Sequence, residues 1–195
     1  MENNDLKRVE MFNKKASKRK YKSNEVIDTL KIKNGFKIAD IGSGGGYFTF
    51  KFAEKVGIEG HVYAIDTNLD FLKYIESQSI INKLKNITTI HIEDGMPKLP
   101  NQKLDYIFLR NVYHHLPNRI KYLQELGIRL KDTGKIIIIE HNGSGFFNFN
   151  KIFGHFVKPE IIINEMEKAG YIVDNQYYFI RQQSFTMFKK EIKNE

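Results

Sequence analysis

A carboxylate followed by alternating glycines gives the chain its clearest chemical signal. The segment 37–48 reads KIADIGSGGGYF, in which an apolar run leads into Asp40. The glycines then stand at every second position: Gly42, Gly44 and Gly46. Because glycine has no Cβ, the backbone there can turn tightly and a ligand can lie against it. A helix predicted to begin near Tyr47 would point its free N–H groups at that ligand.

The glycine spacing indicates which ligand the turn can hold. A dinucleotide-binding turn reads G-x-G-x-x-G, and starting at Gly42 its third glycine would fall on Tyr47. Asp40 stands two residues before the first glycine, where a carboxylate would repel a pyrophosphate. It suits a positively charged ligand group, such as the α-amino group of S-adenosylmethionine. We therefore expect S-adenosylmethionine as the cofactor in preference to a nicotinamide dinucleotide.

The segment resembles motif I of class I S-adenosylmethionine-dependent methyltransferases. This resemblance implies a Rossmann-like α/β sheet that is mostly parallel, with helices on both faces and an antiparallel pair of strands at its C-terminal edge. It also implies that the chain is an enzyme of the small, single-domain type, and it extends over roughly residues 24–190. Four of the expected cofactor contacts lie in the motif itself, and these are Asp40, Gly42, Gly44 and Gly46, with Tyr47 directly after them.

Strand and helix patterns alternate along the chain, as an α/β sheet requires. The expected strands are 36–41, 61–66, 87–92, 104–109, 135–140, 171–180 and 185–189. Helices are expected at 23–30 and 47–56, near 68–75, from Asn118 as N-cap through Leu130, and from Pro159 to Gly170. In such a sheet the ligand lies beyond the carboxyl ends of the strands, so residues at strand ends become candidates.

Three strand-end positions are expected to hold the nucleoside. Asp66 ends the second strand and can accept hydrogen bonds from both ribose hydroxyls, although it could instead cap the next helix. Leu69 just beyond could pack on the adenine face. Asp94 and Gly95 follow the third strand, where Asp94 resembles the adenine-amine acceptor of the family. A plain Asp-Gly turn would account for the same pair.

The fourth and fifth strands are expected to supply the acceptor side of the site. The segment 108–116, FLRNVYHHL, resembles the stretch after the fourth strand of small-molecule methyltransferases. By that resemblance Asn111 would contact the cofactor and Arg110 the substrate. His114 and His115 open the next predicted helix, and one of them could serve as a general base while the other packs.

Two further histidines stand in predicted loops near the same place. His141 ends the fifth strand and His155 lies in an aromatic loop, so both are expected to face the substrate. The histidine spacing is not that of a metal site, and we predict no metal. Methyl transfer from a sulfonium is an in-line displacement that needs mainly proximity and orientation. A base is needed only if the acceptor keeps its proton until late, so catalysis by positioning alone stays open.

Composition narrows the classes of protein further. The 195 residues contain no cysteine, which excludes disulfides, thiolate metal sites and cysteine nucleophiles. No apolar run approaches the roughly 20 residues of a membrane span, and no secretion signal is apparent, so a cytoplasmic location is expected. Nothing in the sequence sets the oligomeric state.

The net charge of +8 is concentrated near the N-terminus. Residues 1–37 hold 11 Lys and Arg against 5 Asp and Glu, whereas the rest hold 20 against 18. We therefore divide the chain into a basic arm, 1–22, and a methyltransferase domain, 23–195. The arm shows no apolar period, so we expect it to cover the cofactor or acceptor without being needed for the core to fold. It could bind phosphates of RNA or a membrane surface, or be merely solvated.

The expected function is methyl transfer to a small-molecule acceptor. No Asn/Asp-Pro-Pro-aromatic motif follows the fourth strand, which argues against amino-methyltransferases of adenine or glutamine. Three alternatives remain: an RNA methyltransferase that grips phosphates with its basic arm, a non-catalytic cofactor-binding module, and, disfavoured by the missing third glycine, a nicotinamide oxidoreductase. The fold by itself does not name the acceptor.

Overall fold

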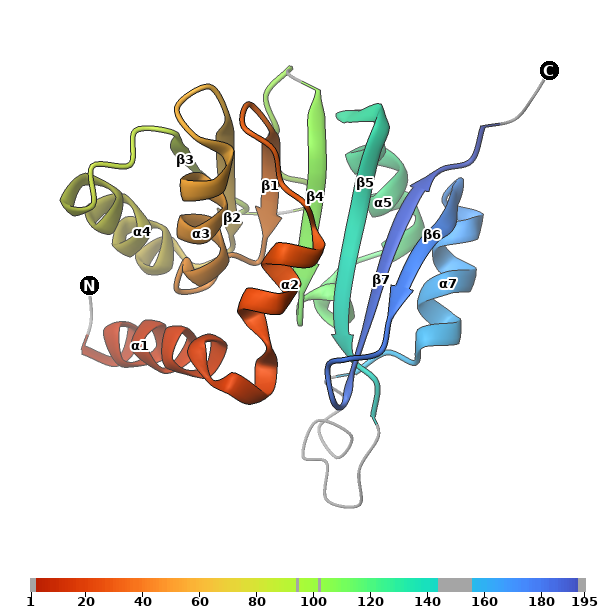
Figure 1. The fold of residues 1–195 in the computed structure, drawn as a ribbon, viewed down its shortest axis with the longest axis horizontal. Coiled ribbons are helices and arrows are strands. Elements are labelled where there is room, and N and C mark those ends of the chain that lie inside the picture. The colour runs from red at the N-terminus through yellow and green to blue at the C-terminus, as the bar shows by residue number, and fades with distance from the viewer. Residues whose placement is uncertain (1–2, 94, 102, 144–155, 193–195) are drawn as a thin grey trace. The chain divides into compact units, whose positions relative to one another are not determined.

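The strand and helix order of the chain follows the expected alternation (Figure 1). The computed structural model describes residues 3–93, 95–101, 103–143 and 156–192. It forms two compact units, Met1–Pro100 and Asn101–Glu195, which are taken in turn. Among the helices of these described ranges, none is long and apolar enough to cross a membrane.

The first unit is built on three parallel strands in the order β3-β2-β1. These are β1 (Lys37–Ile41), β2 (His61–Asp66) and β3 (Ile87–His91). Helix α3 (Tyr47–Val56) joins β1 to β2, and α4 (Leu69–Ile81) joins β2 to β3. Ile38, Phe52 and Ile75 are fully buried, so the helices cover the strands with apolar side chains. The strands and helices stand at the expected positions within a few residues.

The N-terminal arm of this unit is a helix, which the sequence analysis did not predict. Helix α1 (Asn3–Ser17) is followed by a 3₁₀ turn, η1 (Arg19–Tyr21), and by α2 (Ser23–Thr29). Val9 is 0% exposed, and the Phe12 ring meets the Phe71 ring edge-on at 5.7 Å between centroids. The inward apolar side chains are Val9 and Phe12, and two residues are too few to show a helical apolar period in the sequence. Figure 1 shows α1 on the side of the carboxyl ends of β1 and β2.

The second unit has four strands in the order β4-β5-β7-β6. These are β4 (Leu104–Arg110), β5 (Leu130–His141), β6 (Tyr171–Tyr177) and β7 (Gln183–Lys190). β4 and β5 are parallel, whereas β7 is antiparallel to both β5 and β6. Ile136–Ile139 are all buried, as a central strand requires. The antiparallel C-terminal pair is therefore confirmed.

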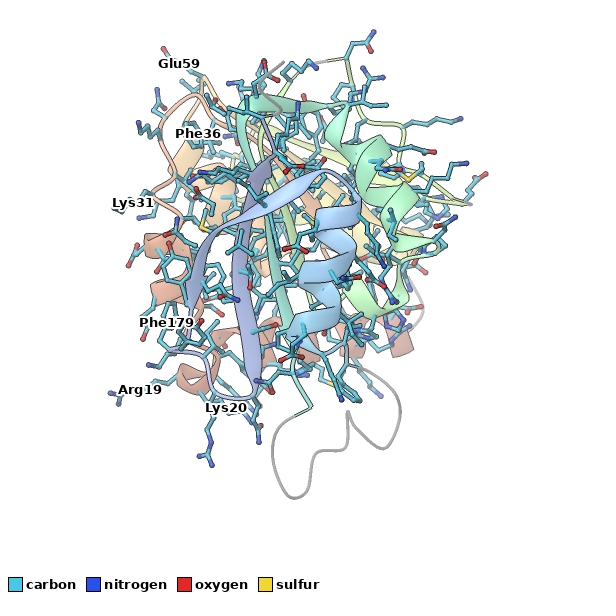
Figure 2. The ribbon with its side chains drawn as sticks, turned by 90° about the vertical axis from the view of Figure 1, so that its right-hand side faces the viewer. Arg19, Lys20, Lys31, Phe36, Glu59 and Phe179 are labelled. Carbon is cyan, nitrogen blue, oxygen red and sulfur yellow. The ribbon has the colours of Figure 1, made fainter. Side chains whose placement is uncertain are left out.

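Among the described residues of the second unit there are also three short elements. They are the 3₁₀ turn η2 (Tyr113–His115), helix α5 (Arg119–Gly127) and helix α7 (Pro159–Lys168), which packs beside β6 (Figure 2). η2 is separate from α5, so His114 and His115 do not open the main helix as expected.

Two details of the α5 prediction are wrong. Leu130 does not belong to the helix, because it starts β5 and pairs with Leu104 of β4. The helix ends at Gly127, where an added Cβ would collide with the Tyr171 hydroxyl. Asn118 makes no capping hydrogen bond, and its φ of 35° is left-handed, whereas a capping residue has an extended backbone. The division into a 1–22 arm and a 23–195 domain stays a prediction.

Candidate functional site

The glycine loop between β1 and α3 is held open by its backbone conformation. Gly44 and Gly46 have φ values of 53° and 80°, in the left-handed region that favours glycine. A Cβ at Gly46 would also lie 2.8 Å from Cγ1 of Ile75 on α4. Gly42 is left-handed as well, with φ of 71°, so all three predicted glycines are required by the turn itself, quite apart from any ligand.

Asp66, at the end of β2, is tied to this loop. Its Oδ2 accepts a hydrogen bond from the Gly44 N–H at 2.8 Å, and its Oδ1 accepts one from the Asn68 N–H at 3.0 Å. The helix cap is Asn68, whose side chain accepts from the N–H groups of Asp70 and Phe71, so the alternative role of Asp66 as N-cap is wrong. A carboxylate oxygen has two lone pairs, and both oxygens therefore keep the capacity to accept a ligand hydroxyl. The ribose role of Asp66 stays a prediction.

Asp40 is a buried carboxyl beside the same loop. Its side chain is 3% exposed, and Thr49 Oγ1 donates a hydrogen bond to its Oδ2 at 2.6 Å. Burial raises the pKa of Asp40 to about 7, and the negative charge of Asp66 adds to that rise against the hydrogen bond from Thr49. A positive charge nearby would favour the ionised form again. This is the electrostatic setting that suits the cationic ligand group expected from the sequence.

Two buried polar atoms around the loop have no hydrogen-bond partner among the described residues. They are Oγ of Ser43, within the loop, and Oδ1 of Asn13, on α1. Nδ2 of Asn13 donates to the Gly45 carbonyl at 2.8 Å, and a Cβ at Gly45 would lie 2.8 Å from the Val9 carbonyl oxygen. Buried polar atoms are nearly always bonded in proteins, so a polar ligand is a reasonable partner for these two. The loop, Asp66 and α1 therefore fit a nucleoside cofactor.

The other predicted cofactor contacts of this unit lie at helix starts and in an exit turn. Tyr47 is the first residue of α3, and Leu69, the first residue of α4, is 50% exposed. Gly95 is exposed and has a left-handed φ of 74°. Asp94 lies outside the described residues. Of the predicted cofactor residues in this unit, Asp66 is therefore bonded to the glycine loop, and Asp40 lies close enough to Asp66 for the two charges to interact.

In the second unit, Glu140 organises the histidines. It ends the apolar part of β5 and is 0% exposed. Its Oε2 lies 2.9 Å from Nδ1 of His114, and its Oε1 accepts from the His141 N–H at 2.8 Å. An ionised carboxylate can only accept hydrogen bonds, so this contact assigns the imidazole proton to Nδ1 of His114. Nε2 is then the nitrogen with an acceptor lone pair.

Three predicted residues and one unexpected residue lie close by in the same unit. The His115 ring packs on the His114 ring at 4.0 Å between centroids. Arg110 donates to Gln183 at 3.1 Å, and Gln183 in turn donates to the side chain of Asn111. His155, predicted to face the substrate, lies outside the described residues.

The end of the fifth strand, Glu140 included, was expected to face the pocket, but sequence reasoning gave Glu140 no role and missed Gln183. A glutamate at the end of four consecutive isoleucines was a signal, because a buried carboxylate needs a partner. Gln183 gave no local signal. Its place is set by the antiparallel register that pairs it with His141.

A partly buried polar network supports the 3₁₀ turn that carries His114. The Tyr113 hydroxyl donates to Glu165 of α7 at 2.8 Å, and Arg119 forms two 2.7 Å hydrogen bonds with the same carboxylate. Arg119 lowers the pKa of Glu165 in this pair. Charge-assisted bidentate pairs fix geometry well, so η2 is held firmly against α5 and α7. Among the described residues, no group of three or more His, Cys, Asp or Glu is arranged to hold a metal ion.

Comparison with known proteins identifies the family. A family model described as a methyltransferase domain matches residues 32–183, from before β1 into β7. The demethylmenaquinone methyltransferase of Geobacillus stearothermophilus is 26% identical over 129 residues, which cover 66% of this chain and 55% of that protein. The ubiquinone/menaquinone biosynthesis C-methyltransferase UbiE of Pasteurella multocida is 22% identical over 156 residues, or 76% of this chain and 58% of that protein. The chain thus spans little more than half the length of these curated relatives.

Solved structures show the same fold. A SAM-dependent methyltransferase from Aquifex aeolicus superposes with a TM-score of 0.83 at 21% identity, covering 94% of this chain and 97% of that one. The [4+2]-cyclase SpnF superposes with a TM-score of 0.72 at 9% identity, covering 88% and 82%. The second match shows that one fold can carry a different reaction. The predicted mostly parallel Rossmann-like sheet is confirmed. With the family model matching most of its length, the chain belongs to the methyltransferase domain family and has the fold of S-adenosylmethionine-dependent methyltransferases.

Proposed function

We propose that this protein transfers the methyl group of S-adenosylmethionine to a small aromatic acceptor that carries an acidic hydroxyl. The single observation that carries the proposal is the glycine loop closed by Asp66 beside the buried Asp40, within a chain of this family. The curated relatives are named for quinones, whose reduced form is an aromatic ring with two hydroxyls, and this supports a hydroxylated aromatic acceptor. A small-molecule acceptor and a cytoplasmic location are part of the proposal.

The residues of the first unit would hold the cofactor. Asp66 would accept the ribose hydroxyls while it keeps the Gly44 N–H, and Asp40 would balance the positive charge of the ligand. Ser43 would find a partner for its buried hydroxyl. The bound cofactor supplies an activated methyl group, so the protein has only to orient the acceptor and exclude water.

The residues of the second unit would prepare the acceptor. His114 would take the proton of the acceptor hydroxyl on Nε2, and Glu140 would act as a positioning residue that holds Nδ1–H. Removing that proton makes the hydroxyl oxygen, or the ring carbon beside it, a stronger nucleophile. Because η2 is fixed by the Tyr113–Glu165–Arg119 network, the imidazole is presented in one orientation.

The test is cofactor-dependent release of S-adenosylhomocysteine with a panel of hydroxylated aromatic acceptors. With an accepted substrate, single-turnover rates between pH 5 and 9 should rise with pH in the wild type. His114→Ala should slow turnover by ~10²–10⁴ with little change in cofactor affinity. Glu140→Gln should change the shape of the pH profile more than it changes cofactor affinity. His61→Ala is the matched control, because His61 stands at the amino end of β2.

The outcomes separate the parts of the proposal. A flat pH profile with an active His114→Ala variant would show that catalysis is by positioning alone. Absence of any S-adenosylhomocysteine release, with cofactor bound, would favour a non-catalytic binding module. Failure of the wild type to bind S-adenosylhomocysteine would refute the proposed cofactor site itself.

A further inference from the structure

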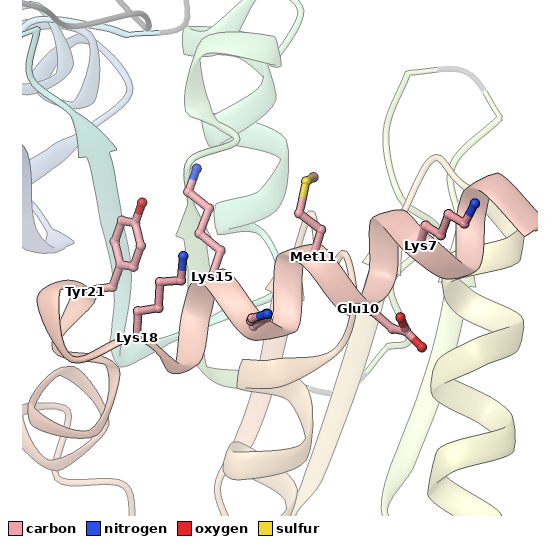
Figure 3. Close-up of a pocket in the computed structure, with 7 residues that line it drawn as sticks. Lys7, Glu10, Met11, Lys15, Lys18 and Tyr21 are labelled. Atoms are coloured by element: carbon pink, nitrogen blue, oxygen red, sulfur yellow. The ribbon is translucent and has the colours of Figure 1, made fainter.

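Helix α1 has two unlike faces. Val9, Phe12 and Asn13 form its inner face, which contacts the glycine loop and α4. The outer face carries a stripe at the spacing of one helical face: Lys7, Met11, Lys14, Lys15 and Lys18. Figure 3 shows Lys7, Met11 and Lys15 projecting to the same side of the helix. The charge is therefore turned away from the core of the first unit.

These side chains line a shallow surface hollow. It encloses about 500 Å³ against α1, with Tyr21 at one end and Glu10 among its lining residues. Lys15 and Lys20 approach the Tyr21 ring at 5.7 and 5.0 Å from its centroid. Figure 2 shows Arg19 and Lys20 directed away from the ribbon beyond the end of α1. The helix and the turn after it thus form one continuous basic surface.

The positive charge of this surface is not neutralised locally. Residues 5–22 hold eight Lys and Arg against two acidic residues. Of these acids, Asp5 is already engaged by Arg8 at 3.1 Å. Within the described part of the chain, Lys7, Lys14 and Lys18 have no ion-pair partner. A dense, uncompensated positive charge on one helix face complements an array of phosphates.

An apolar side chain among the lysines favours a lipid surface over a nucleic acid. Met11 is 54% exposed in the middle of the stripe. A basic helix with exposed apolar groups and a tyrosine at its edge is typical of segments that lie on anionic membranes. Sequence-tolerant binding of single-stranded nucleic acid relies instead on several aromatic side chains that stack on bases.

We propose that the outer face of α1 and η1 docks the protein on an anionic lipid surface. Binding is peripheral and mainly electrostatic, since each lysine near such a surface contributes only modestly and few apolar groups can insert. The inner face of the same helix contacts the glycine loop, so docking holds the cofactor-binding loop at the membrane. An apolar aromatic acceptor dissolved in lipid would then be within reach, and this consequence alone rests on the proposed function.

The experiment is co-sedimentation of the full chain with vesicles, without cofactor or acceptor. The two vesicle types are pure phosphatidylcholine and an equal mixture of phosphatidylcholine and phosphatidylglycerol. The wild type should bind the mixed vesicles only, and 0.5 M salt should release it. The triple variant K14Q/K15Q/K18Q should bind at least tenfold more weakly, because each lysine near an anionic surface is worth about fivefold. Glutamine keeps the helix propensity of lysine, so α1 is retained.

A matched control removes the same charge elsewhere. Lys33, Lys85 and Lys98 are exposed lysines of the first unit outside α1, and K33Q/K85Q/K98Q should bind vesicles within twofold of the wild type. Equal losses in both triple variants would show a net-charge effect and overturn the proposal. So would a wild type that does not bind mixed vesicles, or a K14Q/K15Q/K18Q variant that binds them normally.

RNA binding and cofactor binding, measured in parallel, distinguish the lipid proposal from an RNA-binding surface and from the proposed function. If K14Q/K15Q/K18Q loses affinity for a 20-nucleotide RNA while vesicle binding is unchanged, the surface belongs to RNA and the lipid proposal is wrong. S-adenosylhomocysteine affinity by calorimetry should be the same in wild type and variant, because the changed lysines lie on the outer face. A wild type that binds vesicles but not S-adenosylhomocysteine would sink the proposed function and leave the docking surface standing.

Discussion

Asp40 makes the stability of the cofactor-free protein depend on pH. Its pKa is raised by burial from 3.8 to about 7, so between these values the folded protein binds a proton that the unfolded chain does not. Stability from this group is therefore present at low pH and is lost as pH rises through about 7. Asp40→Asn removes that dependence. The variant should gain about 2–4 kcal/mol relative to wild type between pH 5 and pH 8.

Chemical denaturation of both proteins at pH 5, 6, 7 and 8 checks this expectation. The Thr49→Val variant is a useful companion, because it removes the hydrogen bond that favours the ionised carboxylate. Its pH-dependent loss of stability should be larger than that of the wild type. Parallel stability curves for wild type and Asp40→Asn would mean that Asp40 stays ionised in the folded protein.

Also at the residue scale, Asp66 is expected to bind the ribose hydroxyls of the cofactor in addition to the Gly44 N–H. Asp66→Ala should weaken S-adenosylhomocysteine binding at least tenfold, because each charge-assisted hydrogen bond contributes ~1.5–3 kcal/mol. The same change leaves the Gly44 N–H without its partner, so some loss of stability is also expected. Asp70→Ala is the control of equal charge on the neighbouring helix. Calorimetry on folded variants decides the matter, and unchanged affinity in Asp66→Ala would contradict the ribose assignment.

At the scale of elements, α1 covers the glycine loop without belonging to the sheet. Deletion of residues 1–22 should leave a cooperative unfolding transition but reduce cofactor affinity and turnover. The deletion should also lower the free energy of unfolding, since the burial of Val9 contributes about 1.5–3 kcal/mol to it. A shortened chain with intact activity, or one that cannot fold, would count against this view of α1.

A pair of point variants tests the two faces of α1 separately. Val9→Ser should lower the melting temperature, because Val9 is fully buried. Met11→Ser, on the exposed face, should leave it nearly unchanged. Thermal unfolding followed by circular dichroism measures both, and similar shifts in the two variants would mean that α1 does not pack on the first unit.

At the scale of the whole molecule, ligand binding should report which cofactor the fold accepts. A ligand that binds only the folded state at 100 times its dissociation constant stabilises the protein by ~2.7 kcal/mol. S-adenosylhomocysteine should therefore raise the melting temperature by several degrees, and NAD⁺ at the same concentration should not. Stabilisation by NAD⁺ alone would revive the oxidoreductase alternative, which the missing third glycine disfavours.

The sequence by itself was enough for the glycine loop, the strand that precedes it and the order of strands and helices from α2 onward. These features depend on neighbouring residues: Gly44 and Gly46 take backbone conformations that other residues resist, and four consecutive isoleucines form a strand buried on both faces. Asp40 and Asp66 were singled out for the same reason, since each lies at or near the carboxyl end of a recognisable strand.

Only the tertiary structure decided the contacts that depend on register and packing. The pairing of Glu140 with His114, and of Gln183 with Asn111, joins residues 26 and 72 positions apart. No local sequence pattern indicates a contact between residues so far apart in the chain, because such contacts are set by which strands lie side by side and in what register. Helix α1 was missed for a related reason. Its inner face consists of few residues, and they become a face only where the glycine loop and α4 offer a surface to bury them.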